Sequence, residues 1–220
     1  MTELIVTGIL LDMDGTLVNS NALVEEIWTE FADAHGLDAA HILDISHGRP
    51  TIETLRELLP DTDDAERWRI RNELEGQGLV RTDGVVEIPG AGDFIQRVRA
   101  AGLPHALVTS APHDLAEIRF GAANVAIPDA RITVERVTNG KPHPEPFLLG
   151  ADLLGMSPAT LAGFEDSAAG LQSVRDSGAY AVVVGDFDGP EAEGLPRITD
   201  WRDVEIEPRK SGELLLRIPA

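Results

Sequence analysis

The chain has 220 residues, 43% of them hydrophobic and 25% charged, and its formal net charge is −20. This composition allows a buried core of ordinary size, while so negative a surface repels nucleic acids and anionic membranes. The sequence contains no cysteine, no apolar run near the ~20 residues of a membrane-spanning helix and no basic flank of a signal peptide. We therefore expect a monomeric, cytoplasmic protein that binds neither nucleic acid nor membrane.

The first predicted element is a strand over residues 8–12, in which apolar residues run directly into Asp12. After it, apolar residues recur with a helical period, and no convincing strand is predicted up to about residue 87. The acidic stretch DTDDAE in this block is more typical of a solvated helix start than of a metal site. The predicted helices carry Leu23, Ile27 and Phe31 before a stop at His35-Gly36, and then cover residues 51–59 and 63–74.

Beyond residue 88, strands and helices alternate with short turns between them. This alternation favours a parallel sheet with helices on both faces. The final stretch, VEIEPRKSGELLLRI, predicts a β-hairpin that turns near Lys210-Ser211-Gly212. The other predicted elements are helices over residues 91–101, 112–124, 146–154 and 168–177, a helix start at residues 157–158, and strands over residues 105–109, 131–134, 161–165 and 179–184.

The predicted fold is therefore of the α/β class, with a Rossmann-like parallel-sheet core and a C-terminal β-hairpin. We expect residues 1–20 and 88–220 to form this core as the catalytic domain. Residues 21–87 are expected to form a helical cap domain, inserted after the first strand. An insertion at this point would lie above the C-terminal ends of the strands, where open α/β sheets bind their ligands.

Two aspartates, Asp12 and Asp14, end the first strand in the stretch LLDMDGTLVNS. Because alternate residues of an extended chain point the same way, both carboxylates face one place. A divalent cation between them, or a proton on one of them, makes such a pair tolerable. Gly15 permits a tight turn whose free amides can meet an anion. Taken alone the stretch is more often a plain Asp-Gly turn, and a calcium loop lacks the preceding helix and the later acidic ligand.

Polar residues also follow the ends of later strands. Thr109 and Ser110 precede a predicted helix, where free amides form an anion site or an ordinary helix cap. Lys141, one of only two lysines in the chain, lies on the proline-rich turn TNGKPHPEPF and can act as a point charge against phosphate. Chance could also explain why a lysine stands at this position. Glu165 and Asp166 end a strand before small residues, a pattern of metal ligands or of an acidic helix start.

Taken together, these groups include the nucleophile, the acid/base, the cation and the charge neutralisers that phosphoryl transfer requires. The motifs DMDGT, VTS, GKP and FEDS resemble those of the haloacid dehalogenase superfamily, in the subfamily with a helical cap after the first strand. The resemblance covers nearly the whole chain. ISHGR and GKPHPEPF more narrowly resemble phosphatases of small sugar and polyol phosphates, such as glycerol-1-phosphatases, 2-deoxyglucose-6-phosphate phosphatases and hexitol phosphatases.

The resemblance implies a Mg²⁺-dependent phosphatase that hydrolyses small phosphorylated sugars or polyols through an aspartyl-phosphate. Asp12 would be the nucleophile, and Asp14 would protonate the leaving alcohol and then activate water. Mg²⁺ would be held by the side chains of Asp12 and Asp166, by the backbone carbonyl of Asp14 and, through water, by Glu165. Thr109 and Lys141 would complete the catalytic set, and the implied phosphate-binding residues are Gly15, Thr16, Thr109, Ser110 and Lys141.

Cap contacts to the substrate are expected from His47, Gly48 and Arg49 of ISHGR, although an ordinary turn between helices would look the same. Asn19 stands where family members often carry aspartate. The alternative functions are a β-phosphoglucomutase-like phosphotransferase and a non-catalytic sugar-phosphate binding protein. Val24 disfavours the mutase, because β-phosphoglucomutases carry a histidine at this position.

Overall fold

A computed structural model of the protein describes residues 1–209 and 212–219. At its centre lies a six-stranded sheet with the order β6-β5-β2-β7-β8-β9, whose neighbouring strands all pair in parallel. The predicted parallel sheet is confirmed, and its first strand in sequence, β2, lies between β5 and β7. The strands are β2 (Gly8–Leu11), β5 (His105–Val108), β6 (Ala130–Ile132), β7 (Leu161–Glu165), β8 (Tyr180–Val184) and β9 (Arg197–Ile198).

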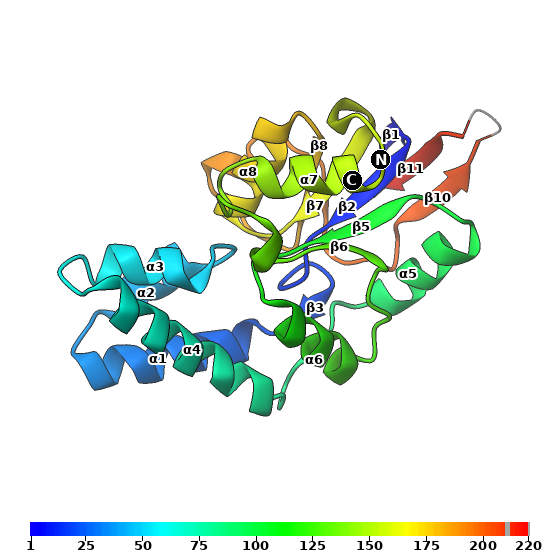
Figure 1. The fold of residues 1–220 in the computed structure, drawn as a ribbon. Helices are drawn as coiled ribbons and strands as arrows, with labels where there is room; N and C mark the ends of the chain where they lie inside the picture. The colour runs from blue at the N-terminus through cyan, green and yellow to red at the C-terminus, as the bar shows by residue number, and fades with distance from the viewer. Residues whose placement is uncertain (210–211, 220) are drawn as a thin grey trace.

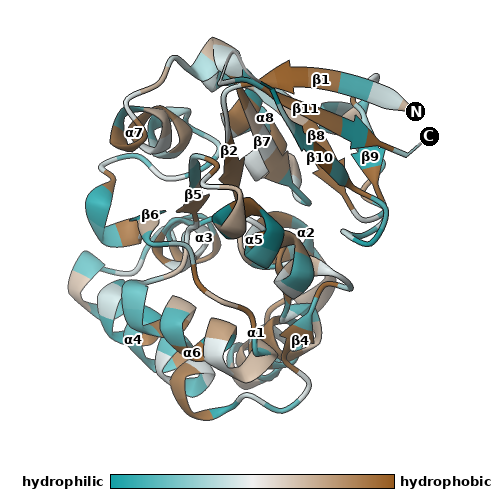
Figure 2. Ribbon diagram, turned by 90° about the vertical axis from the view of Figure 1, so that its right-hand side faces the viewer, coloured by the Kyte–Doolittle hydropathy of each residue, from teal (hydrophilic) through white to brown (hydrophobic). Residues whose placement is uncertain are grey.

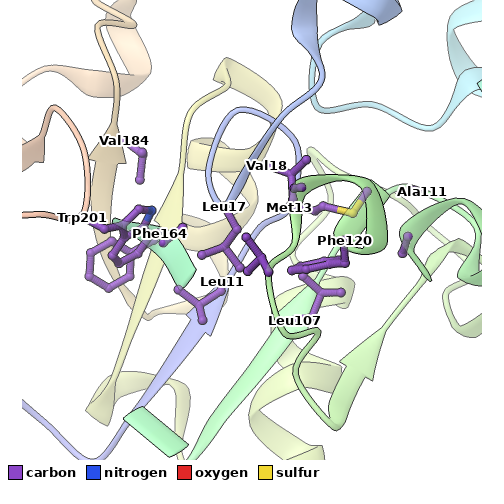
Figure 3. Close-up of a cluster of buried hydrophobic side chains, with 14 of the residues drawn as sticks. Leu11, Met13, Leu17, Val18, Leu107, Ala111, Phe120, Phe164, Val184 and Trp201 are labelled. Atoms are coloured by element: carbon purple, nitrogen blue, oxygen red, sulfur yellow. The ribbon is translucent and has the colours of Figure 1, made fainter. Parts of the chain in front are cut away.

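Helices cover both faces of the sheet, since alternate strand residues point to opposite sides. Ile9 and Leu11 face the cluster that contains α5 and α6, and Leu10 faces α7 and α8. Figure 3 shows part of the first cluster, where the rings of Phe164 and Trp201 have centroids 4.9 Å apart. In Figure 2 the central strands β2 and β5 are coloured as hydrophobic over most of their length. The covering helices are α5 (Ala91–Ala100), α6 (His113–Ala123), α7 (Glu145–Leu153) and α8 (Ala168–Ser177).

Four helices between β2 and α5 pack mainly on one another, and Figure 1 shows them as a group to one side of the sheet. The chain enters and leaves this helical segment through two short strands, β3 and β4, which pair antiparallel. The β4 strand corrects the expectation that the block 21–87 contains none. None of the described helices is long and apolar enough to cross a bilayer. The elements of the segment are β3 (Val18–Asn19), α1 (Asn21–His35), α2 (Ala39–Ser46), α3 (Thr51–Leu58), α4 (Asp64–Val80) and β4 (Val86–Glu87).

One predicted helix end is wrong: the helix expected over residues 63–74 continues as α4 to Val80. The glycines at positions 76 and 78 cost about 1 kcal/mol each in helix propensity, which favours an earlier end. However, a β-carbon at Gly78 would lie 3.1 Å from Leu115 Cδ1 of α6. The glycine therefore permits close packing of α4 on α6, and this packing outweighs the local propensity.

The chain termini form a second, three-stranded sheet in the order β1-β11-β10. The predicted hairpin is present as the antiparallel pair of β10 and β11, and its predicted turn residues Lys210 and Ser211 lie outside the described residues. β1 is not among the predicted strands, and its pairing with β11 joins the two ends of the chain. The helix predicted to start at residues 157–158 is instead a single 3-10 turn, because the chain enters β7 directly. The bounds are β1 (Thr2–Val6), β10 (Glu205–Pro208), β11 (Leu214–Ile218) and the turn Pro158–Thr160.

Candidate active site

The predicted site residues meet because their strands are neighbours. β2 lies between β5 and β7, and all three run in the same direction, so the residues after their C-terminal ends share one edge of the sheet. Asp12 follows β2, Thr109 follows β5, Glu165 ends β7 and Asp166 follows it. Residues up to 154 positions apart in sequence are thereby gathered at one place.

Lys141 lies fully buried beneath Asp12, at 0% exposure. Its Nζ donates to Asp12 Oδ1 at 2.5 Å, to Glu165 Oε1 at 2.6 Å and to the Val108 carbonyl at 2.9 Å. These three bonds use all three ammonium protons. Burial by itself would lower the pKa of Lys141, but the carboxylates of Asp12 and Glu165 outweigh it and raise that pKa above its ordinary value. Lys141 is therefore a permanent positive charge under the nucleophile candidate.

Glu165 is held on both of its oxygens by the protein itself. Lys141 occupies Oε1, while Oε2 accepts from the backbone amides of Asp166 and Ser167 at 2.9 and 3.1 Å and from the Ser167 hydroxyl at 3.0 Å. Gly170 makes room for this carboxylate, since a β-carbon there would lie 1.8 Å from the carboxyl carbon. Protein donors thus occupy both oxygens of Glu165, and its contact to a metal through water stays a prediction.

The carboxylates of Asp12, Glu165 and Asp166 offer oxygens that all lie within 4.8 Å of one another. Burial, together with the charge of Glu165, raises the pKa of Asp12 to about 8. Burial and the charges of Glu165 and Asp12 likewise raise the pKa of Asp166 well above its usual range. The single charge of Lys141 thus does not neutralise the three acids. Negative charge therefore remains uncompensated at these carboxylates, and a divalent cation could balance it. Donors that are all oxygen atoms fit Mg²⁺.

A cavity between the sheet edge and the helical segment contains most of the predicted residues. Gly15, Thr16, Lys141 and Glu165 are not part of its wall. Gly15 lies under Asp166, where a β-carbon would be 1.8 Å from Oδ2. The Thr16 hydroxyl is buried and has no hydrogen-bond partner within the described chain. The predicted residues that line the cavity are Asp12, Asp14, His47, Gly48, Arg49, Thr109, Ser110 and Asp166.

The ISHGR loop touches the core on both sides of the site. Ser110 Oγ donates to the Gly48 carbonyl at 2.9 Å, and a β-carbon on Gly48 would lie 2.0 Å from Ser167 Oγ. Only a glycine fits this close approach, and its φ of +73° also favours glycine. Arg49 is held from within the helical segment by Glu57 at 2.9 Å, while its buried Nε has no hydrogen-bond partner among the described residues.

Arg119 and Glu75 line the cavity and Ser20 lies beside it, and none of the three is among the site residues predicted from the sequence. Arg119 Nη1 and Ser20 Oγ each donate to one oxygen of Asp14, both at 2.5 Å. Glu75 lines the cavity from α4 and pairs with Arg71 at 2.6 Å, and burial raises the pKa of Glu75. No local motif marks Arg119 or Glu75. Ser20 lies in the stretch around Asp12, but its hydroxyl carries no signature of its own.

Helices α1 and α4 contribute mainly apolar residues to the cavity wall. Val24 is part of this wall, in the position that carries histidine in β-phosphoglucomutases. Asn19, the other departure from the family pattern, is an exposed residue of β3 and does not line the cavity. The apolar residues that these two helices contribute are Val24, Ile27 and Trp28 of α1 and Leu74 of α4.

Comparisons with known proteins agree with this geometry. Residues 6–178 match the family described as haloacid dehalogenase-like hydrolase. Hexitol phosphatase A of Escherichia coli (strain K12) is 36% identical over 177 residues, covering 80% of this chain and 82% of that protein. Glycerol-1-phosphate phosphohydrolase 1 of Saccharomyces cerevisiae is 32% identical over 191 residues, covering 81% of this chain and 74% of that protein.

Solved structures share the fold. A hydrolase from Pseudomonas syringae superposes with a TM-score of 0.74 at 25% identity, covering 89% of this chain and 94% of that one. A β-phosphoglucomutase from Clostridium difficile superposes with a TM-score of 0.79 at 19% identity, covering 91% and 93%. With its motifs at the strand ends, the chain belongs to the haloacid dehalogenase-like hydrolases.

Proposed function

We propose that this haloacid dehalogenase-type phosphatase hydrolyses small phosphorylated sugars or polyols, with Mg²⁺ and through an aspartyl-phosphate on Asp12. The observation that carries the proposal is the pairing of Asp12 with Lys141 at the floor of a cavity whose edge also holds Asp14 and Asp166. The names of two relatives, a hexitol phosphatase and a glycerol-1-phosphate phosphohydrolase, support the substrate class. Residues 21–87 act as a cap domain on the core formed by residues 1–20 and 88–220.

Asp12 attacks the phosphorus atom in the first half of the proposed reaction. Lys141 engages Oδ1, so Oδ2 is the oxygen that can turn toward the substrate. A bond forms between Oδ2 and phosphorus, the bond between phosphorus and the ester oxygen breaks, and Asp14 gives a proton to the leaving alcohol. Thr109 Oγ1 accepts a hydrogen bond from the Ala111 amide at 3.1 Å, which leaves its proton to be donated to a phosphate oxygen.

In the second half, a water molecule takes the place of the departed alcohol. Asp14 removes a proton from this water, the water oxygen bonds to phosphorus, and the bond between phosphorus and Asp12 breaks. Inorganic phosphate is released, and Asp12 returns to its carboxylate form. Lys141 stays in contact with Asp12 throughout and balances the charge that passes between Asp12 and the phosphoryl group.

Mg²⁺ would be held by the side chains of Asp12 and Asp166 and the backbone carbonyl of Asp14, with Glu165 acting through water. When bound, it supplies the positive charge that keeps Asp12 ionised and offsets the charge of the phosphoryl oxygens. The need for this charge follows from the pKa of Asp12, which burial and Glu165 raise to about 8 in the protein alone. At neutral pH the nucleophile would otherwise be largely protonated.

The helical side of the cavity would recognise the alcohol part of the substrate. Glu75, whose side chain is 12% exposed, offers carboxylate oxygens to sugar or polyol hydroxyls. Arg49, which lines the same cavity, offers guanidinium N–H groups to a hydroxyl or a phosphate oxygen. The apolar residues around them, such as Val24 and Trp28, exclude water from the site.

Release of inorganic phosphate from a panel of sugar and polyol phosphates, with purified protein and Mg²⁺, tests the proposal. We expect turnover of a subset of these monoesters, and none after Asp12→Asn substitution. A Mg²⁺-loaded wild-type protein that releases no phosphate from any monoester would refute the function. Activity that survives Asp12→Asn would refute the nucleophile assignment.

The two alternatives give different results in related assays. Conversion of β-glucose 1-phosphate to the 6-phosphate with a bisphosphate primer would identify a mutase. Val24 disfavours this activity, because its side chain can neither accept nor donate a proton. Binding by calorimetry without turnover would identify a non-catalytic binding protein. A monomeric state and a cytoplasmic location remain predictions, which sedimentation and fractionation would test.

A further inference from the structure

Arg119 is a buried cation next to the predicted proton-transfer residue. It extends from α6, its side chain is 9% exposed, and its Nη1 lies 2.5 Å from Asp14 Oδ2. On the other side of the same carboxylate, Ser20 Oγ donates to Oδ1 at 2.5 Å. The two donors come from different parts of the chain: Arg119 from a helix against the sheet, and Ser20 from the connection between β3 and α1. Each carboxylate oxygen of Asp14 therefore accepts a hydrogen bond from a side chain.

The surroundings of Arg119 fix its guanidinium group in place. Leu115 and Phe120 anchor α6 in the hydrophobic core. From the opposite side α4 approaches closely, since a β-carbon on Gly78 would lie 3.8 Å from Arg119 Nη2. With both α6 and α4 against it, the side chain has little freedom to leave Asp14.

A purely stabilising role explains this arrangement poorly. A buried ion pair contributes little net stability, because removing two charges from water offsets their attraction. The Nε of Arg119 is also buried without a hydrogen-bond partner in the described residues, so the guanidinium is not placed for the largest number of bonds. It is placed against Asp14, whose carboxylate is 27% exposed and lines the cavity.

We propose that Arg119 is a positioning residue that, together with Ser20, holds the Asp14 carboxylate in the orientation for proton transfer to and from the substrate. The inference rests on the proposed function, in which Asp14 carries the proton. Each carboxylate oxygen has two lone pairs, so an oxygen that accepts from Arg119 or Ser20 can still bind the transferred proton. Proton transfer requires a donor and an acceptor within hydrogen-bond distance, which makes the rate sensitive to small displacements of Asp14.

Two esters with different leaving groups separate this role from a structural one. Glycerol phosphate has an alkoxide leaving group that must be protonated, whereas the p-nitrophenolate of p-nitrophenyl phosphate departs without a proton. We expect Arg119→Met to lower kcat/KM for glycerol phosphate by about 10–100-fold and for p-nitrophenyl phosphate by less than about threefold. The loss for glycerol phosphate should appear in kcat rather than in KM.

Further variants keep the test independent of folding. Arg119→Lys retains a cationic donor and is expected to recover most of the lost rate. Ser20→Ala removes the second donor and should give a smaller loss with the same dependence on the leaving group. Arg67→Met is the matched control: this arginine is 11% exposed, donates to the Leu59 and Pro60 carbonyls and does not line the cavity. We expect it to alter thermal stability without changing the ratio of the two kcat/KM values.

The results that overturn the inference differ from those that overturn the function. Equal losses for both esters in folded Arg119 and Ser20 variants, or a rise in KM alone, would assign Arg119 to structure or to substrate binding. Variants with wild-type rates would exclude the role altogether. A wild-type protein that releases phosphate from no monoester of the panel would instead refute the proposed function, and the role of Arg119 with it.

Discussion

The two sides of the cavity are built from different kinds of structure and different kinds of side chain. On the sheet side, Asp12, Asp166 and Thr109 follow the ends of neighbouring strands, and the buried Lys141 holds Asp12 in place. On the helical side, α1 and α4 contribute mainly apolar residues, with Glu75 as a buried acid among them. The first side concentrates the acidic groups and a buried lysine, and the second combines hydrocarbon with a few polar side chains such as Arg49 and Glu75.

This difference indicates that one side of the cavity serves the chemical step and the other the choice of substrate. Strand ends in a fully buried sheet are rigid, which suits groups that must be held within a fraction of an ångström for chemistry. The helical segment is joined to the core through β3 and β4 and touches it at loops such as Gly48 on Ser110. We therefore expect loss of the nucleophile Asp12 or of its partner Lys141 on the sheet side to affect every ester alike, and changes on the helical side to alter the choice among esters.

The largest effect is expected from Asp12→Asn. The amide cannot attack phosphorus, so kcat should fall by at least about 10⁴-fold for every ester. Phosphate release from glycerol phosphate and from p-nitrophenyl phosphate would be measured side by side, with circular dichroism to verify the fold. A variant that loses activity toward only one ester would break the division between the two sides.

Lys141→Met is expected to have the next largest effect, on stability as well as on turnover. Removing the cation leaves the carboxylates of Asp12 and Glu165 buried without compensation, which costs about 3–5 kcal/mol of unfolding free energy. Urea unfolding of the metal-free protein at pH 8 measures this loss. Arg217→Met is the control, because Arg217 also contacts several acids but on the surface, and its loss should be much smaller. Equal losses for the two variants would contradict the importance of burial.

On the helical side, Glu75→Gln is expected to change selectivity by a smaller factor. The neutral amide is a weaker acceptor for substrate hydroxyls, so KM for a polyol phosphate should rise by about tenfold. p-Nitrophenyl phosphate has no hydroxyl groups to bind, and its kcat/KM should stay within about twofold of the wild-type value. Steady-state kinetics with both esters test this prediction. Equal losses of kcat/KM for the two esters would instead indicate that Glu75 takes part in catalysis.

The smallest effect concerns pH. The folded-state pKa of Asp12 is about 8, against an ordinary value of 3.8, so between these values the folded protein binds more protons than the unfolded chain. The contribution of Asp12 to stability therefore falls as pH rises from about 4 to 8. Without Mg²⁺, Asp12→Asn should gain stability relative to the wild type across this range, by on the order of 1 kcal/mol or more. Saturating Mg²⁺ should abolish this pH dependence in the wild type. If the difference in unfolding free energy between Asp12→Asn and the wild type did not change with pH, the raised pKa of Asp12 would be contradicted.

Most of the fold follows from hydrophobic periodicity. β7 and α8 begin and end where the pattern predicts, since each is a regular run with a clear stop, such as Gly178 after α8. The elements absent from the predictions include β1, α2, β4 and the two-residue β9. β9 is too short to show a period, and β1 is a strand because β11 pairs with it, which a local pattern does not reveal.

The site residues likewise divide into those that a local pattern predicts and those that only the fold brings together. Each of Asp12, Thr109, Lys141 and Asp166 could be found from the sequence, because each lies within a short motif at a predicted strand end or turn, and parallel strands bring their ends to one edge. Their roles remain proposals until the variants are measured. The residues of ISHGR are recognisable in the same way, although only the structure shows that Gly48 lies against Ser110 and Ser167.

By itself, then, the sequence determined the α/β class, the helical insertion after β2 and the order of acidic, hydroxyl and lysine groups along the sheet edge, because these depend on local period and on where strands end. Tertiary structure alone decided that Arg119, 105 residues after Asp14, grips that carboxylate, and that Glu75 enters the cavity from α4. The physical reason is that these contacts join elements far apart in the sequence, whose approach depends on tertiary packing. The close packing of α4 on α6 at Gly78 is one example, and no local pattern reveals it.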